Sequence, residues 1–279
     1  MSNRSRIVWT DATWNPIRAI SREGSAGWHC EHVSEGCRHC YAEGMNSRFG
    51  TAIPYARQWR ETARHVLNDK VLVQPMRWRN PRLIFVGSMT DVFGEWVTDE
   101  MLDRVFTVMA LLPQHTFQVL TKRPERMFAA IKRIGRSIEI LEAQARKMGW
   151  TLKWMDYGLV PFPLPNVWLG VSVEDQASAD ARIPHLINTP SVLHFLSAEP
   201  LLGPVNLGAA SQRLGWVICG AESGPQARPM HLDWVRSLRD QCAASEVPFF
   251  FKQAVVDGRK VSLPLLDGRR WNEVPEMKR

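Results

Sequence analysis

Short apolar runs recur along the chain and predict buried β-strands. The runs are continuously apolar and rich in β-branched or aromatic residues, which is typical of parallel strands covered on both faces. They occupy residues 83–86, 117–120, 167–173, 192–196, 216–219 and 249–251.

Amphipathic stretches separate these runs and predict helices at residues 98–112, 124–147, 175–187 and 232–245. The first has Thr98 as N-cap, an acidic first turn and Pro113 after its end. Repeated β-α alternation predicts an α/β fold with a parallel sheet and right-handed crossovers. About six such units fit, so we expect a partial or full β/α barrel of the TIM type, with a doubly wound open sheet as the alternative.

Two segments fall outside this alternation. Residues 147–165 carry aromatic residues and three prolines. They precede a strand, which favours a structural insertion over a substrate lid. Residues 257–279 contain two Asp-Gly turn signals and are predicted to form a basic tail or hairpin-like cap on a main domain of residues 1–256.

The composition is that of a globular protein. The 279 residues are 45% hydrophobic and carry 35 Lys and Arg against 28 Asp and Glu, which excludes collagen-like, mucin-like and disulfide-miniprotein classes. No apolar run approaches the roughly 18 residues of a membrane span, and no signal peptide is recognisable. We therefore expect a cytoplasmic protein without membrane association. The net charge of +7 suggests a polyanionic partner or serves solubility alone.

Three of the five cysteines lie close together and predict a metal centre. Cys30, Cys37 and Cys40 have the spacing C-x6-C-x2-C. Three thiolates can bind three irons of a cubane cluster and leave the fourth open. Zinc is equally compatible with the spacing, because histidines lie in the same loop. Cys219, in a predicted strand, and Cys242, on a predicted helix, are interpreted as packing residues.

Polar side chains follow five consecutive predicted strands. In a β/α barrel such strand ends meet at one mouth, so we expect a single polar pocket. Each residue alone could be a helix cap or turn residue. Lys122 is the hardest to explain in this way, because a helix cap does not need an ammonium group. The residues are Ser88, Thr90, Asp91, Lys122, Ser172, Glu174, Asp175, Glu199 and Glu222, with Arg182 a little further on.

Residues 57–64 and 76–82 mix arginine with Trp59 and Trp78. Basic and aromatic interleaving is typical of nucleic-acid stacking, but a solvated face with two core tryptophans gives the same pattern.

Several motifs together resemble a phage-associated family of radical S-adenosylmethionine (SAM) proteins, related to spore photoproduct lyase. The likeness covers nearly the whole chain. The usual radical SAM loop is C-x3-C-x2-C, whereas this family shares the longer first gap found here. The motifs are WTDATWNP from Trp9, the Cys30–Glu43 loop, GSMTD from Gly87, LTKRP from Leu120, NVWLGVS from Asn166, FLSAEPL from Phe195 and GAESG from Gly220.

The resemblance implies a partial (β/α)6 barrel, a [4Fe-4S] cluster on Cys30, Cys37 and Cys40, and SAM at the open iron. Ser88, Thr90 and Asp91 match the element that meets the SAM amino group, and Lys122 matches a lysine at the SAM carboxylate. Ser172 and Arg182 match the element near the ribose and carboxylate, and Tyr41 matches an adenine-contacting aromatic. Glu199 and Glu222 are assigned to the same cofactor pocket from their strand ends.

The expected activity is that of a radical SAM enzyme of isomerase or lyase type. SAM is cleaved reductively to a 5′-deoxyadenosyl radical, which abstracts hydrogen from a substrate. The expected substrate is a nucleic-acid base or modified nucleotide, for example an amino-acid adduct of thymidine in hypermodified phage DNA. The expected electron donor is a flavodoxin or ferredoxin, in the host cytoplasm if the protein is phage-encoded. The alternative is a non-catalytic, zinc-binding nucleic-acid-binding protein.

Overall fold

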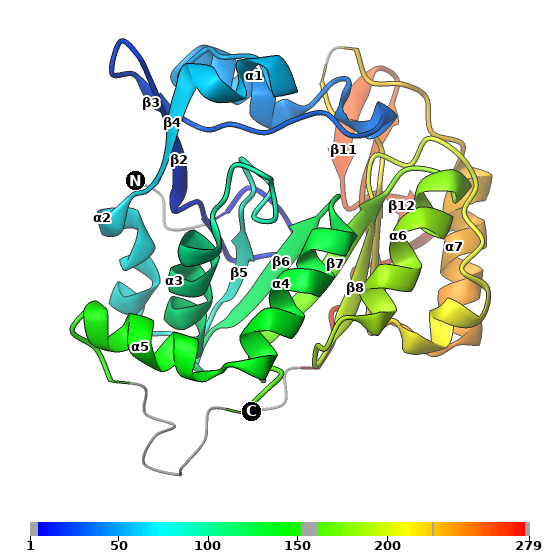
Figure 1. Cartoon of the computed structure of the whole chain (residues 1–279). Coiled ribbons are helices and arrows are strands. Elements are labelled where there is room, and N and C mark those ends of the chain that lie inside the picture. Colours follow the sequence, from blue (N-terminus) through cyan, green and yellow to red (C-terminus); the bar gives the residue numbers. More distant parts are fainter. Residues whose placement is uncertain (1–4, 152–160, 225, 277–279) are drawn as a thin grey trace.

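A curled eight-stranded sheet lies at the centre of the fold (Figure 1). The computed structural model describes residues 5–151, 161–224 and 226–276. Within these residues the strand order is β1-β5-β6-β7-β8-β9-β10-β11, and β1 and β11 form the two edges of an open half-barrel. Neighbouring strands are parallel from β1 to β10, and only β11 is antiparallel to its neighbour. The bounds are β1 (Ala12–Trp14), β5 (Leu83–Val86), β6 (Thr116–Thr121), β7 (Val167–Val173), β8 (His194–Ala198), β9 (Trp216–Gly220), β10 (Phe249–Val256) and β11 (Arg259–Ser262).

The predicted α/β class and the six predicted strands are confirmed, with shifted ends in some cases. Strand β8 begins two residues later than predicted, and β10 continues to Val256 through a register shift between Phe251 and Gln253. The short strand β1 was not predicted, because its three residues carry no recognisable apolar run.

The sheet has apolar side chains on both faces. On the helix side, Phe117 and Val171 belong to the main core. On the concave side, Phe85, Trp168 and Trp216 belong to a separate aromatic layer. Strand β7 is buried at every position, as expected for a parallel strand covered on both faces.

Among the described residues, helices follow the strands of the sheet in the chain, and one sequence prediction about them is wrong. Residues 124–147 form two helices, because Ser137 leaves helical geometry at φ −141° and ψ 64°. The second of these buries Leu141 and Ala145 and packs against the helix that precedes β6. The sequence pattern of one continuous helix is thus interrupted because the second part packs in a different direction. The helices are α3 (Asp99–Ala110), α4 (Pro124–Arg136), α5 (Glu139–Lys147), α6 (Gln176–Asn188) and α7 (Leu232–Ala244).

The part of the chain from β2 to β4, between β1 and β5, forms a roof over the carboxyl ends of the strands, drawn in blue and light blue to cyan in Figure 1. It contains a small antiparallel sheet in the order β3-β2-β4, and the cysteine loop, which leads into the 3-10 helix η1 and then α1. This roof was not predicted. Its elements are β2 (Ile17–Ser21), β3 (Ala26–Gly27), η1 (Glu35–Cys37), α1 (Tyr41–Phe49), η2 (Arg57–Thr62) and β4 (Ala63–Leu67). The chain then runs beside α3 through α2 (Asp69–Leu72) and η3 (Gln74–Arg77) before it enters β5. The 3-10 helix η5 (Gly208–Arg213) lies between β8 and β9 in the chain.

Two hairpins form the C-terminal region. Strand β11 pairs with β10, and β12 (Leu265–Leu266) pairs with β13 (Arg269–Arg270). Both Asp-Gly pairs have positive φ at each residue, 49° and 71° in the first and 53° and 77° in the second. Asp-Gly tolerates this left-handed geometry, which two-residue hairpin turns require.

The predicted insertion at residues 147–165 includes residues 152–160, which lie outside the described residues. In the described part of this segment, Phe162 packs against Gly135 of α4. None of the helices in the described ranges is long and apolar enough to cross a membrane.

Candidate functional site

A cavity of about 800 Å³ opens at the carboxyl ends of the strands, beneath the roof. It brings together the cysteines and the strand-end residues that the sequence singled out. Glu174, Asp175 and Arg182 are the exceptions and do not line it. The predicted residues that line the cavity are Cys30, Cys37, Cys40, Tyr41, Ser88, Thr90, Asp91, Lys122, Ser172, Glu199 and Glu222.

Asp91 locks the end of β5 to the end of β6. One carboxylate oxygen accepts hydrogen bonds from Thr121 Oγ1 at 2.7 Å and from the Phe93 amide at 2.9 Å. The other accepts from the Lys122 amide at 3.0 Å and from Arg123 Nη1 at 3.1 Å. With four donors already bound, Asp91 has little capacity for a ligand and acts as a positioning residue.

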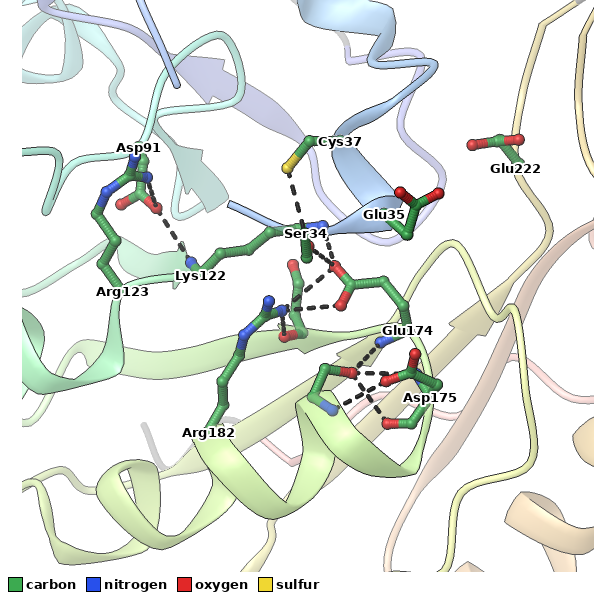
Figure 2. A network of polar contacts seen from close by, with 12 residues as sticks. Ser34, Glu35, Cys37, Asp91, Lys122, Arg123, Glu174, Asp175, Arg182 and Glu222 are labelled. Atoms are coloured by element: carbon green, nitrogen blue, oxygen red, sulfur yellow. Dashed lines mark hydrogen bonds and ion pairs between the residues drawn. The ribbon is translucent and has the colours of Figure 1, made fainter. Parts of the chain in front are cut away.

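Glu174, directly after β7, is the centre of a buried polar network (Figure 2). Its carboxylate is paired with Lys122 and accepts from Arg182 Nη1 at 3.0 Å and from Ser34 Oγ at 2.9 Å. Burial alone would raise the pKa of this carboxyl, but Lys122 and Arg182 outweigh burial and hold the pKa below its usual value. The network joins β6, β7 and the cysteine loop.

Arg182 lies behind the cavity wall. Besides Glu174, its Nη1 donates to the Ser172 carbonyl at 2.7 Å. Asp175 is the N-cap of α6 and forms a capping box with Ser178. Asp175 therefore has the helix-cap role that the sequence offered as the alternative to a role in the pocket. Arg182 instead stabilises the end of β7 through its contacts with Ser172 and Glu174.

The cysteine loop is held against the strand ends at its start and again at Gly36. Thr90 Oγ1 donates to the His29 carbonyl at 2.5 Å, next to Cys30. At Gly36 the loop approaches Glu174 so closely that any Cβ would overlap the Glu174 side chain. Glycine at this position is therefore required for the close approach.

Glu222 fixes the other side of the same loop. It accepts from His39 Nδ1 at 3.0 Å and from Arg228 Nη2 at 2.6 Å. Arg228 also donates to the Glu35 carbonyl at 2.8 Å. Although burial opposes ionisation, the hydrogen bonds from Arg228 and His39 lower the pKa of Glu222 to about 2.

The three loop thiols are free and partly buried. Burial is the main cause that raises the pKa of Cys30 and Cys40. Cys219 and Cys242 are also free but lie in the main core, as predicted. Among the residues that the structure describes, no group of three or more His, Cys, Asp or Glu side chains is arranged to hold a metal ion.

The remaining predicted residues are also held by protein contacts. Tyr41 donates from its hydroxyl to the Ser88 carbonyl at 2.6 Å, which fixes the ring beside the cavity. Asn15 Nδ2 donates to the Ser88 hydroxyl at 3.0 Å, and Glu199 is paired with Lys252.

Sequence reasoning missed the connecting residues of this site. Glu174 was predicted only as one of several strand-end residues. Its position two residues after Ser172, at the same strand end, was the signal in the sequence that could have indicated its central role. Arg228 follows the GAESG motif by four residues and is not part of it, so no motif marked it. The arginine- and tryptophan-rich segments are partly structural, since Arg60 is paired with Glu31 and Glu95 and Trp78 is buried.

Comparison with known proteins places the chain in one family. The family model described as "Protein of unknown function (DUF5131)" matches residues 4–275, so the chain belongs to this family. A search of curated proteins and a search of solved structures returned no match.

Proposed function

We propose that the chain is a radical SAM enzyme whose open half-barrel is the partial (β/α)6 barrel of that class. The observation that carries the proposal is the shared cavity. Three cysteines from one loop and polar residues from five successive strand ends, far apart in the sequence, line the same space. A chain that used the cysteine loop only to stabilise a fold would not need this pocket beside it.

By type and number, the donors of the cysteine loop match those of a [4Fe-4S] cluster with one open iron. Cys30, Cys37 and Cys40 line the cavity, whereas the other two cysteines are buried in the core. Three thiolates bind three irons. When bound, the cluster and SAM supply the reductive cleavage of SAM to methionine and a 5′-deoxyadenosyl radical, which takes hydrogen from the substrate.

The chain's own residues hold the loop and orient the ligand. Glu174, Glu222 and Thr90 fasten the cysteine loop to the strand ends. Lys122 lines the cavity while paired with Glu174. An ammonium group has three donors, so Lys122 can also bind the SAM carboxylate. The fixed ring of Tyr41 offers a flat face for adenine.

The substrate that we propose is a nucleic-acid base or modified nucleotide, supported by the net charge of +7. A flavodoxin or ferredoxin would supply the electron. The decisive experiment is anaerobic purification and reconstitution with iron and sulfide. A brown protein that binds SAM supports the proposal, and a colourless zinc protein without SAM binding favours the alternative of a zinc-bearing nucleic-acid-binding protein.

A further inference from the structure

The carboxylates that line the cavity are all neutralised by the protein itself. Within the described residues, Glu31 is paired with Arg60, Asp91 with Arg123, Glu199 with Lys252, and Glu222 with Arg228. The lining lysine Lys122 is likewise paired with Glu174. These pairs brace the strand ends, and each of the four lining carboxylates already has a cationic partner in the protein.

Three other lining cations are not neutralised in this way. Arg6, Arg48 and Lys260 line the cavity and are exposed to solvent. Throughout residues 5–151, 161–224 and 226–276, the structure shows no ion pair from any of them to a carboxylate. The guanidinium of Arg48 lies 5.8 Å from the ring centroid of its neighbour Phe49.

The three cations come from separate parts of the chain. Arg6 precedes β1, Arg48 lies near the end of α1, and Lys260 lies on the edge strand β11. Figure 1 shows α1 and β11 on the same side of the molecule, above the ends of the sheet strands. The fold thus assembles three positive charges around one cavity, and within the described residues no carboxylate compensates them.

Aromatic side chains line the same cavity. Trp9 and Phe85 are buried with ring centroids 4.7 Å apart, and the Tyr41 ring is fixed through its hydroxyl. Aromatic faces accept a base by stacking, and arginine and lysine bind phosphate oxygens through charge-assisted hydrogen bonds. Since the SAM carboxylate is assigned to Lys122, these three cations remain available for a second anion.

We propose that Arg6, Arg48 and Lys260 form a phosphate-binding rim, and that the cavity takes a nucleotide with its base inside and its phosphate at this rim. The identification of this nucleotide as the substrate rests on the proposed radical SAM function. The rim itself rests only on the charges and rings that line the cavity. The nucleotide can be free or part of a strand, and the two sources share the same phosphate chemistry.

The test compares two triple variants of the full-length protein. Arg6→Gln/Arg48→Gln/Lys260→Gln removes the rim, and the control Arg22→Gln/Arg259→Gln/Arg270→Gln removes three exposed cations outside the cavity. The probes are a fluorescent single-stranded DNA oligonucleotide, titrated at several salt concentrations, and thymidine monophosphate, titrated by calorimetry. Thermal melting checks that each variant is folded.

The rim variant should bind one or both probes at least about tenfold more weakly than the wild type, while the control stays within about twofold. If the strand is the ligand, the slope of log K against log salt should fall in magnitude by about 2, at roughly 0.7 for each phosphate that is no longer neutralised. Weaker binding of the strand alone identifies a nucleic acid, and weaker binding of thymidine monophosphate alone identifies a free nucleotide. Equal effects in both triple variants, or binding of neither probe to the wild type, overturn the rim.

Iron content and SAM affinity, measured on the same variants, separate this inference from the proposed function. The rim variant should retain both. A wild-type protein without iron or SAM binding would contradict the radical SAM proposal, whereas a rim-dependent decrease in nucleotide binding would still support the phosphate rim.

Discussion

Lys122 and Glu174 form an ion pair that joins the end of β6 to the end of β7 beneath the cysteine loop. Glu174 is almost fully buried and also accepts from Arg182 and Ser34. Because Glu174 is itself held by these contacts, its ion pair with Lys122 fixes the ammonium group at the cavity wall. The same lysine is the residue to which we assign the SAM carboxylate.

Lys122→Ala should weaken SAM binding about 10- to 100-fold, because a charge-assisted hydrogen bond contributes roughly 1.5–3 kcal/mol. Iron content should remain that of the wild type. Equilibrium dialysis with labelled SAM measures the affinity, and Lys132→Ala on the exposed face of α4 serves as control.

A second variant separates direct contact from support through the network. Glu174→Gln breaks the ion pair but keeps the Lys122 ammonium group, so SAM affinity should fall only a few-fold. If Glu174→Gln costs as much affinity as Lys122→Ala, the ion pair and not a lysine–SAM contact sets the binding.

Gly36→Ala should displace the cysteine loop, because its new Cβ would overlap the Glu174 side chain. We expect destabilisation of about 1–3 kcal/mol, typical of overpacking, together with reduced iron uptake. The matched control is Gly44→Ala in α1, where the added Cβ would have no atom within 4 Å other than those of its chain neighbours and its own helix backbone.

In that helix interior, alanine is favoured over glycine by up to about 1 kcal/mol. In chemical denaturation, Gly44→Ala should therefore be at least as stable as the wild type, and Gly36→Ala should be clearly less stable. In iron analysis, Gly44→Ala should take up as much iron as the wild type, and Gly36→Ala should take up less. Equal stability and equal iron uptake in the two variants would show that the loop does not rest on Glu174.

Glu222 should make the protein sensitive to acid. Its pKa is lowered to about 2 from the reference value of 4.5. The contribution of this carboxylate to stability is therefore complete above pH 4.5 and is lost as the pH falls through about 2.

Melting curves from pH 7 to pH 2 test this dependence. The difference in melting temperature between the wild type and Glu222→Gln should stay constant down to about pH 5 and then shrink. Glu139→Gln, an exposed change on α5, should show no such trend, and a constant difference down to pH 2 would exclude Glu222 as the source.

The cysteines should divide into two groups. Cys37→Ala should abolish iron binding, because Cys37 lines the cavity, whereas Cys219→Ala should retain it, because Cys219 is buried in strand β9. Since Cys219→Ala leaves only a small cavity in the core, its iron content should match the wild type when both are folded. Equal iron loss in the two variants would refute the assignment of the ligands.

The sequence was sufficient to predict those elements and site residues whose positions follow from a local pattern of residues. The apolar run at Leu83–Val86 forms β5 with those bounds, and the polar residues after the strands meet because parallel strand ends share one edge. The roof could not be predicted, since η1 and the strands β2 to β4 are short and depend on contacts with the sheet. The Lys122–Glu174 pair depends on the pairing of β6 with β7, and the break at Ser137 depends on how α5 packs, so neither has a local signal.

The most direct test of the central claim is the metal and SAM chemistry of the anaerobically reconstituted full-length protein. After reduction with dithionite in the presence of SAM, iron and 5′-deoxyadenosine are quantified in the wild type and in Cys37→Ala. The account predicts about four irons per chain and 5′-deoxyadenosine from the wild type, and neither from the variant. A wild-type protein that holds zinc instead of iron, or that holds iron but yields no 5′-deoxyadenosine, would contradict it.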